Sequence, residues 1–327
     1  MNVFELIAAP TAIFRCSEMR ISRNSSGPPD QDHSLSLRKL PILIREIRPL
    51  EWIKNVFVLA PLFFSGQGKD IDKLLGVSFV FLAFCCVASA IYIFNDIHDR
   101  ELDRLHPRKR DRPIASGELS VGLAAVMATV LACTGLLFVA FHPPVLILLS
   151  SYFLINVSYT LWLKHVVILD IFCIAAGFVL RVFAGGAAID VPPSSWLILA
   201  TFLLSLFLAL AKRRHEILVS EESSNAHRPV LEQYNLKLVD ELISVVTPVT
   251  LITYLLYTLD PSTISRFNAK LLYLTSVFVV FGIFRYLYLI HRMSLGGAPA
   301  ELLTRDMPLF LAILCWVVSF VLIVYSA

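Results

Sequence analysis

Long apolar runs separated by short polar segments occupy most of the chain. The runs fall at about 50–65, 74–94, 120–141, 143–163, 166–187, 194–211, 239–259, 269–290 and 307–326. A helix that crosses a bilayer needs roughly 20 mainly apolar residues, and most of these runs approach or reach that length. The pattern therefore predicts an all-α, polytopic membrane protein with nine transmembrane helices. The first run is short and carries Glu51, Lys54 and Asn55 near its start, which is typical of a segment that enters from the polar interface.

The first 40 residues differ from the rest of the chain. Residues 3–14 are apolar but contain Glu5 and Pro10, and no basic residue precedes them, which does not fit a cleaved signal peptide. Residues 21–36 are rich in Ser, Pro, Asp and Asn, a composition typical of disorder. We therefore expect residues 1–40 to form a largely disordered N-terminal extension and residues 41–327 to form the transmembrane domain.

The overall composition agrees with a membrane protein. The chain of 327 residues is 57% hydrophobic and 16% charged, with a mean hydropathy of +0.73, which excludes an ordinary soluble globule. The six cysteines are scattered without a CxxC pair, so we interpret them as small apolar residues and expect neither a zinc site nor a disulfide framework. The chain has no Gly-rich phosphate loop, Ser/His/Asp set or nucleic-acid motif.

Basic residues are distributed unevenly between the two sides of the predicted membrane. Segments after odd-numbered spans carry four: Lys69, Lys73, Arg266 and Lys270. Segments after even-numbered spans carry fifteen: Arg100, Arg104, Arg108, Lys109, Arg110, Arg112, Lys164, Lys212, Arg213, Arg214, Arg228, Lys237, Arg285, Arg292 and Arg305. Because loops rich in Lys and Arg stay in the cytoplasm, the second group and the N-terminus are predicted to be cytoplasmic.

Acidic residues cluster where the second apolar run ends. On a helix with about 100° per residue, Asn95 at 0° shares one arc with Asp99 at about 40°, Asp103 at about 80° and Asp96 at about 100°. Three like charges on one face repel each other and favour a bound cation. Hard oxygen ligands suit Mg²⁺, which is usually completed by waters and substrate phosphates. The arc therefore predicts a magnesium site at the cytoplasmic membrane surface.

Cationic residues lie beside this acidic arc and at the same membrane face. They are Lys109, Arg110 and Arg112 in the next loop, Lys54 in the first run, Lys164 after the fourth, Lys212 and Arg213 after the sixth, and Arg285 near the end of the eighth. Together they predict a pocket for phosphates at the bilayer surface. For each basic residue taken alone, positive-inside bias or snorkelling is as good an explanation as a role in the site. Neither effect explains the acidic arc. Arg181, inside the fifth run, suits either a site role or a structural ion pair.

The motif Asn95-Asp96-x-x-Asp99-x-x-x-Asp103, followed by Lys109-Arg110-x-Arg112-Pro113, resembles the UbiA superfamily of intramembrane prenyltransferases. The resemblance covers about residues 45–326 and is greatest to the decaprenyl-phosphate phosphoribosyltransferase branch. Further resembling stretches are Arg48-Pro49-x-x-Trp52-Ile53-Lys54-Asn55, Leu163-Lys164-His165, Leu180-Arg181-x-x-Ala184-Gly185-Gly186, Ala211-Lys212-Arg213-Arg214-His215-Glu216 and Leu303-Thr304-Arg305-Asp306.

The resemblance implies a UbiA-type bundle in the bacterial inner membrane, with a cytoplasmic active site. It also implies a Mg²⁺-dependent transfer of 5-phosphoribose from phosphoribosyl diphosphate (PRPP) to a polyprenyl phosphate of the decaprenyl type, with diphosphate released. Members of this branch supply lipid-linked D-arabinose precursors for the cell envelope, and a similar rhizobial nodulation protein is linked to arabinosylation of Nod factors. The oligomeric state and the prenyl chain length stay open.

The resemblance also implies roles for individual residues. Mg²⁺ is expected on Asn95, Asp96, Asp99 and Asp103, of which the three aspartates are the expected catalytic residues. The leaving diphosphate is expected on Lys109, Arg110 and Arg112. The expected contacts for the ribose 5-phosphate or the lipid phosphate are Lys54, Lys212 and Arg213, and the same motifs add Asn55, Lys164 and Glu216 as substrate-binding residues.

Two other functions remain open at this level. A UbiA-type enzyme that moves a prenyl group from prenyl diphosphate to an aromatic acceptor shares the fold and the first motif. Such enzymes carry a second aspartate-rich motif after the sixth span, where this chain has Lys212, Arg213, Arg214 and the single acid Glu216. A transporter or flippase is the other alternative, although the polar residues cluster on one membrane face and matched inverted repeats are not evident.

Overall fold

The computed structural model describes residues 41–106, 109–222, 234–292, 302 and 306–325. All regular structure in these residues is helical, and eight segments are long and apolar enough to cross a membrane. These are α3 (Ile71–His98), α6 (Val121–Phe138), α7 (Pro143–Leu161), α8 (Leu169–Ala188), α9 (Ser195–Glu222), α10 (Leu236–Leu259), α12 (Ser276–Arg292, preceded by η5 at Leu272–Thr275) and α14 (Met307–Tyr325). The all-α membrane fold is confirmed, and the expectation for residues 1–40 lies outside the described residues.

The first predicted span, at about 50–65, has a different form. Residues 49–64 form the 3₁₀ helix η2 (Pro49–Leu59) followed by the short α-helix α2 (Ala60–Phe64), so this stretch is not counted among the eight long helices. A 3₁₀ helix rises about 2.0 Å per residue, compared with 1.5 Å in an α-helix. The eleven 3₁₀ residues and the five α-helical residues together extend about 30 Å, which is close to the thickness of the hydrocarbon layer.

The long helices begin where the sequence provides capping groups. Asp70 accepts a hydrogen bond from the N–H of Lys73 at the start of α3, and Asn235 accepts one from Leu238 at the start of α10. Pro143 occupies the first turn of α7, where its missing N–H costs nothing. The polar residues between the apolar runs therefore set the helix boundaries.

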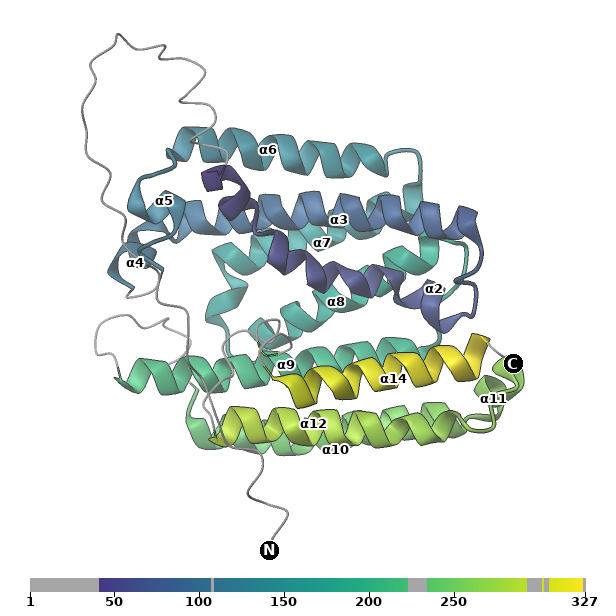
Figure 1. Ribbon diagram of the computed structural model, residues 1–327. Helices are drawn as coiled ribbons and strands as arrows, with labels where there is room; N and C mark the ends of the chain where they lie inside the picture. The colour runs from purple at the N-terminus through teal and green to yellow at the C-terminus, as the bar shows by residue number, and fades with distance from the viewer. Residues whose placement is uncertain (1–40, 107–108, 223–233, 293–301, 303–305, 326–327) are drawn as a thin grey trace, which may run out of the picture. The chain divides into compact units, whose positions relative to one another are not determined.

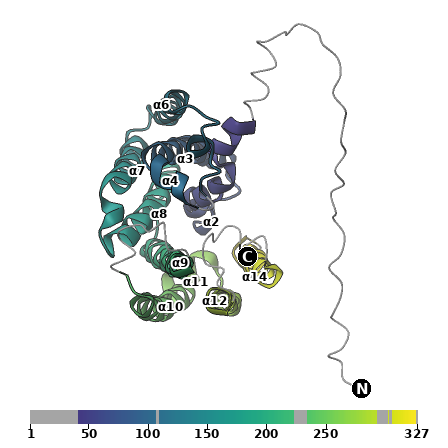
Figure 2. The same cartoon turned by 90° about the vertical axis from the view of Figure 1, so that its left-hand side faces the viewer.

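The helices pack mostly in chain order. Figures 1 and 2 show the long helices side by side, and neighbouring pairs include α3 with α6 and α7, α7 with α8, α8 with α9, α9 with α10, and α12 with α14. The segment η2–α2 packs against α3 and α8. Short elements at one end join these helices: α4 (Arg100–Leu105), α5 (Pro113–Ser116) and η3 (Leu163–His165). The opposite end carries α2 and α11 (Pro261–Phe267).

Two glycines allow close contact between helices. A Cβ atom on Gly185 of α8 would lie 1.8 Å from the carbonyl oxygen of Val58 in η2. A Cβ atom on Gly135 of α6 would lie 2.8 Å from the carbonyl oxygen of Ala83 in α3. Small residues let backbones approach in this way in membrane bundles. The run of small residues from 184 to 188 therefore brings α8 against η2, which carries two of the predicted site residues.

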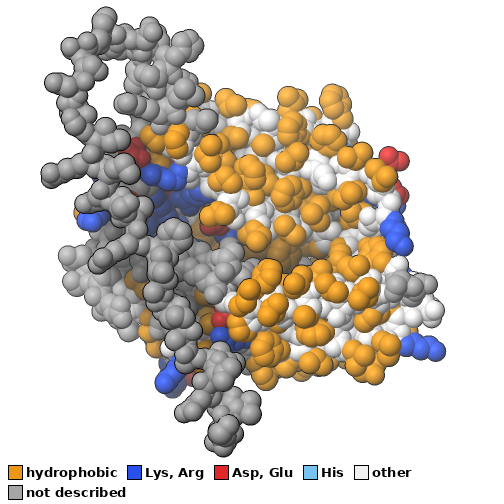
Figure 3. All heavy atoms as spheres, in the orientation of Figure 1, with side chains coloured by type: hydrophobic (Ala, Val, Ile, Leu, Met, Phe, Trp, Pro, Cys, Tyr) orange, Lys and Arg blue, Asp and Glu red, His pale blue; other side chains and the backbone are white. Residues whose placement is uncertain are grey.

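The surface matches a bilayer environment. Hydrophobic side chains cover the flank of the bundle, whereas Lys, Arg, Asp and Glu gather at its ends (Figure 3). Large apolar residues such as Phe79, Val126 and Leu154 are about 60% exposed, and in a bilayer such surface contacts lipid. The molecule is therefore an integral membrane protein.

Candidate active site

The acidic motif lies where α3 ends and α4 begins. The N–H of Asp99 donates to the carbonyl oxygen of Asn95, and the N–H of Asp103 donates to that of Asp99, each over 2.8 Å. These bonds continue the helical path from α3 into α4. The side chains of Asp96, Asp99 and Asp103 are buried, with 2, 8 and 4% of the residue surface exposed. Three acidic side chains are thus held inside the protein, where each needs a compensating positive charge.

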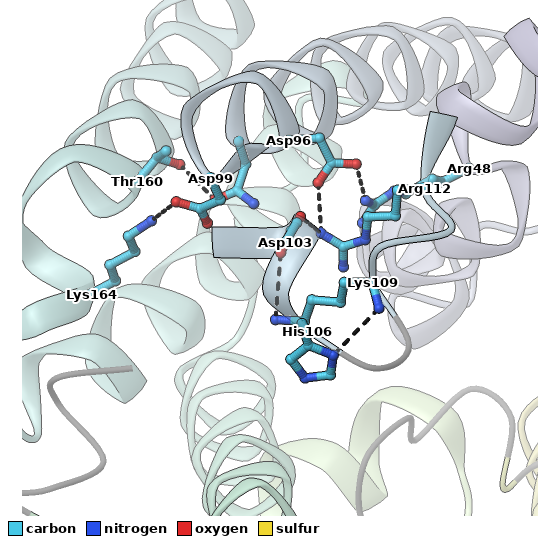
Figure 4. Close-up of polar contacts among 10 residues, drawn as sticks. Arg48, Asp96, Asp99, Asp103, His106, Lys109, Arg112, Thr160 and Lys164 are labelled. Carbon is cyan, nitrogen blue, oxygen red and sulfur yellow. Dashed lines mark hydrogen bonds and ion pairs between the residues drawn. The ribbon is translucent and has the colours of Figure 1, made fainter. Parts of the chain in front are cut away.

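Asp99 and Asp103 have different cationic partners (Figure 4). The ammonium of Lys164, on η3, lies 2.6 Å from Asp99 and is itself only 4% exposed. The guanidinium of Arg112, at the start of α5, lies 2.6 Å from Asp103, and the ammonium of Lys109 lies 4.0 Å from it. Positive groups from separate elements therefore neutralise the two carboxylates.

Asp96 is bound by two guanidinium groups. Arg112 donates to one of its carboxylate oxygens over 2.9 Å, and Arg48 donates to the other. Arg112 thus bridges Asp96 and Asp103. Because both oxygens of Asp96 are occupied by arginines, this carboxylate holds Arg48 and Arg112 in place in the structure.

A small polar pocket lies on the arginine side of Asp96. Its volume is about 200 Å³, and its lining is almost wholly charged. Glu46 is 1% exposed, and burial, together with the nearby Asp96, raises the pKa of its carboxyl group to about 7. Burial also raises the pKa of Asp103, although Arg112 and Lys109 oppose that rise. The pocket is lined by Arg45, Glu46, Arg48, Asp96, Asp111, Arg112 and Pro113.

The donor set fits magnesium that is held jointly with a phosphate ligand. Asn95, Asp99 and Asp103 supply hard oxygen atoms at the α3–α4 junction, and Thr160 of α7 lies 3.5 Å from the amide oxygen of Asn95. Within the described ranges, no three His, Cys, Asp or Glu side chains are grouped closely enough to hold a metal unaided. Mg²⁺ is commonly bound by one or two carboxylates, waters and substrate phosphates, and two carboxylates are what this junction offers.

Lys54 reaches the site from η2. Its ammonium forms an ion pair with Glu51 and lies 3.4 Å from the hydroxyl of Tyr92, which is one turn before Asp96 on α3. Lys212 on α9 acts electrostatically on the same Glu51. Lys54 therefore lies beside the acidic motif, and the positive charge of Lys212 favours the ionised form of its partner Glu51.

Arg213, another predicted phosphate contact, points into the protein. Its guanidinium donates to Asp170 over 2.6 Å, to Tyr159 over 3.1 Å and to Glu216, and only 2% of the side chain is exposed. Glu216 is thereby engaged with Arg213. The structure thus places Arg213 in a buried polar network between α7, α8 and α9, with the partly exposed Glu216 at its edge.

Arg181 and Asn55 form a second buried network, deeper in the bundle. Arg181 donates to the amide oxygen of Asn55, the hydroxyl of Tyr152 and the carbonyl oxygen of Gly177, each over 2.8 Å. Its guanidinium also lies 4.5 Å from the ring centre of Tyr152. Neutral groups and aromatic rings therefore surround this cation, and no carboxylate pairs with it among the described residues.

Arg110 lies at the outer edge of the site. Its side chain is 67% exposed, and its guanidinium is 3.9 Å from Asp111. Arg285 of α12 was also predicted to contribute to the phosphate pocket. In the structure its guanidinium pairs with Asp306 over 2.7 Å and not with the acidic motif.

Several residues in the site or its supports are not evident from the sequence pattern. Arg48 and Tyr159 stand out in the sequence only as parts of longer polar stretches, whereas Glu46, Asp170 and Tyr234 carry no motif. Asp170 is fully buried at the start of α8, where it pairs with Arg213 of α9. An acidic residue inside a predicted span was the one signal that could have identified it.

Comparison with known proteins identifies the family. The model of the UbiA prenyltransferase family matches residues 55–314, which is most of the chain. The chain belongs to the UbiA prenyltransferase family. It is therefore a membrane enzyme of the UbiA transferase family, and its acidic motif lies within the matched region.

Three individual proteins illustrate how similar the chain is to members of this family. The decaprenyl-phosphate phosphoribosyltransferase of Corynebacterium glutamicum is 35% identical over 288 residues, which cover 86% of each chain. The nodulation protein NoeC of Azorhizobium caulinodans is 36% identical over 175 residues, which cover 52% of this chain and 55% of NoeC. A UbiA homologue from Archaeoglobus fulgidus, bound to GPP and Mg²⁺, superposes with a TM-score of 0.66 at 18% identity, covering 88% of this chain and all of that one. This last similarity shows that the UbiA fold is shared.

Proposed function

We propose that this UbiA-family enzyme transfers 5-phosphoribose from PRPP to a polyprenyl phosphate and releases diphosphate. The observation that carries the proposal is the pairing of two buried aspartates, Asp99 and Asp103, with Lys164, Arg112 and Lys109. Such a site offers oxygen ligands for a metal and cations for phosphates side by side. The 35% identity to a decaprenyl-phosphate phosphoribosyltransferase over 86% of both chains supports this substrate pair.

Asn95, Asp99 and Asp103 are the proposed ligands for magnesium. When bound there, Mg²⁺ would neutralise charge on the diphosphate as the anomeric C–O bond breaks. In the structure, Lys164 and Arg112 neutralise these same carboxylates. We propose that these cations turn to the diphosphate oxygens when the donor occupies the site, so that each charge keeps a partner.

The remaining cations divide by position. Arg112 and Lys109 lie next to Asp103 and suit the leaving diphosphate, with Arg110 at the exposed edge. Lys54 pairs with Glu51, whose charge Lys212 also favours, and we propose both lysines for the phosphate of the lipid acceptor or of the ribose. We assign Asp96, Arg213 and Glu216 to positioning. Asp96 holds Arg48 and Arg112 in place, and Arg213 pairs with Glu216 within the bundle.

The acceptor needs no general base in this mechanism. A phosphate monoester has a second pKa of about 6, so it is largely ionised at neutral pH and can attack the anomeric carbon directly. The polyprenyl tail would lie among the apolar helix surfaces in the bilayer. We further propose a bacterial inner-membrane location with the site facing the cytoplasm, and a product that serves as a lipid-linked pentose precursor for envelope or nodulation glycans.

A labelled-donor assay tests the proposal. Purified protein in nanodiscs would be incubated with Mg²⁺, polyprenyl phosphate and PRPP labelled in the ribose, and the lipid extract would be analysed by mass spectrometry. The expected product is polyprenyl-phosphoryl 5-phosphoribose. Asp99→Ala should reduce its formation by at least a hundredfold, because the metal loses a carboxylate ligand, while size-exclusion chromatography should show intact protein.

A parallel reaction would contain a labelled prenyl diphosphate and an aromatic acceptor in place of the phosphoribosyl donor. Prenylated product from the wild-type protein, together with no product from PRPP, would contradict the proposal. Equal turnover by wild-type protein and Asp99→Ala at saturating Mg²⁺ would instead contradict the assignment of Asp99 as a magnesium ligand.

A further inference from the structure

A buried trio of polar residues lies beside the site but does not enter it. Arg213 of α9, Asp170 of α8 and Tyr234, just before α10, are 2, 0 and 4% exposed. Arg213 donates to one oxygen of Asp170 over 2.6 Å, and the Tyr234 hydroxyl donates to the other over 2.8 Å. Both oxygens of the carboxylate are therefore satisfied, one by a side chain of α9 and the other by the tyrosine that precedes α10.

The trio connects to the turn between α7 and α8, which carries Lys164. The Tyr234 hydroxyl accepts a hydrogen bond from the N–H of Ile168 over 2.7 Å. Ile168 has a φ of 70°, in a region that a β-branched residue rarely occupies without strain. The hydroxyl therefore holds the backbone in an unfavourable conformation at the point where the turn enters α8.

The same trio also holds the other side of the turn. Arg213 donates to the hydroxyl of Tyr159 in the last turn of α7, five residues before Lys164. Lys164 thus lies between two anchored points, Tyr159 on one side and the pair Ile168 and Asp170 on the other. Its ammonium is 2.6 Å from Asp99, and a buried charge pair of this kind depends on accurate placement of both groups.

We propose that Tyr234 is a positioning residue: through Ile168 and Asp170 it sets the turn that presents Lys164 to Asp99 and to the donor diphosphate. This inference rests on the proposed phosphoribosyl transfer. It adds a residue from the α9–α10 connection to the determinants of the site. The hydroxyl, rather than the aromatic ring, makes both bonds, one to Ile168 in the turn and one to Asp170 in the first turn of α8.

The test is a double-mutant cycle between Tyr234→Phe and Lys164→Ala. Tyr234→Phe keeps the ring and removes the hydroxyl, so the N–H of Ile168 and one oxygen of Asp170 lose their partner. We expect kcat/KM for PRPP to fall about tenfold, mainly through a higher KM for PRPP, with the KM for the lipid unchanged. In the Lys164→Ala background the same substitution should change kcat/KM less than twofold, because the residue it positions is absent.

Tyr286→Phe is the matched control. Tyr286 of α12 is 5% exposed, and its hydroxyl has no hydrogen-bond partner among the described residues. Removing that hydroxyl should leave both KM values unchanged. If Tyr234→Phe lowers the yield of folded protein, Asp170→Asn provides a second test in the same cycle, since it weakens the same link and leaves Tyr234 intact.

The outcomes separate this inference from the proposed function. Equal fold losses for Tyr234→Phe in the wild-type and Lys164→Ala backgrounds would show a general structural role and overturn the inference. Wild-type kinetics for Tyr234→Phe would overturn it as well. Absence of PRPP turnover in the wild-type protein itself would instead contradict the proposed function.

Discussion

Asp99 and Asp103 lie one helical turn apart, yet each has its own cation. Lys164 places an ammonium 2.6 Å from Asp99, and Arg112 places a guanidinium 2.6 Å from Asp103. A carboxylate that is already paired binds a free metal ion less tightly, because the metal must displace the resident cation. At the scale of single residues, the site is therefore suited to a metal that brings its own anion.

Replacing Lys164 tests this competition directly. In Lys164→Met the Asp99 carboxylate loses its ammonium partner, so Mn²⁺, as a probe for the magnesium position, should bind the donor-free protein about tenfold more tightly, roughly 1.4 kcal/mol. Electron paramagnetic resonance titration measures this affinity, while turnover should fall. Lys237→Met is the control, because Lys237 is 85% exposed and pairs only loosely with Glu241 at 3.9 Å. Unchanged Mn²⁺ affinity in Lys164→Met would contradict the competition.

Among the helices, the contact between α8 and η2 determines where two site residues lie. Gly185 lets the α8 backbone approach Val58 so closely that a Cβ atom would lie 1.8 Å from its carbonyl oxygen. The same 3₁₀ helix carries Lys54 near the acidic motif and Asn55 beside Arg181. The position of η2, and therefore of Lys54, depends on a glycine in another helix.

Gly185→Val is expected to push η2 away from α8. Overpacking against backbone that cannot move aside should lower the stability by about 3 kcal/mol and raise the KM for the substrate whose phosphate contacts Lys54. A thermal-shift assay in detergent measures the first effect. Gly122→Ala on α6 is the control, because its added Cβ has no neighbour within 4 Å, and Ala favours a helix. A melting temperature for Gly185→Val equal to that of Gly122→Ala would contradict this packing argument.

At the scale of the whole molecule, the two ends of the apolar bundle differ in their side chains. The acidic motif and its cations lie at the end formed by α4, α5 and η3, and the aromatic residues Phe63, Tyr254 and Trp316 pack together at the opposite end. Trp316 donates to the Tyr254 hydroxyl over 2.6 Å there. A bundle with this polarity is expected to insert with its basic end in the cytoplasm.

Cysteine labelling tests that orientation. In a background that lacks all six native cysteines, Asp111→Cys at the basic end and Lys69→Cys before α3 each place one thiol at an exposed position. A membrane-impermeant maleimide added to intact cells should label Lys69→Cys alone, and inverted vesicles should give the reverse. Labelling of Asp111→Cys in intact cells would place the site outside and contradict the proposed use of cytoplasmic PRPP.

The sequence predicted the helical spans and the position of the acidic motif well, because both depend on local spacing. Apolar length locates a transmembrane helix, and the four-residue spacing of Asn95, Asp99 and Asp103 survives the break between α3 and α4. The exception was the segment 50–65. Its apolar pattern is the same for an α-helix and for the 3₁₀ helix that forms.

Partners between distant segments could not be predicted from spacing. Lys164 is 65 residues from Asp99, and Arg181 is 126 residues from Asn55. Lys212 and Arg213 are adjacent in the chain, yet Lys212 acts on Glu51 whereas Arg213 is buried against Asp170. The amino-acid order alone determined which stretches are helical, which end is charged and which acids share a helix face. Which cation meets which acid was decided by how the helices pack, because an ion pair depends on distances of a few ångströms between elements that local pattern does not position.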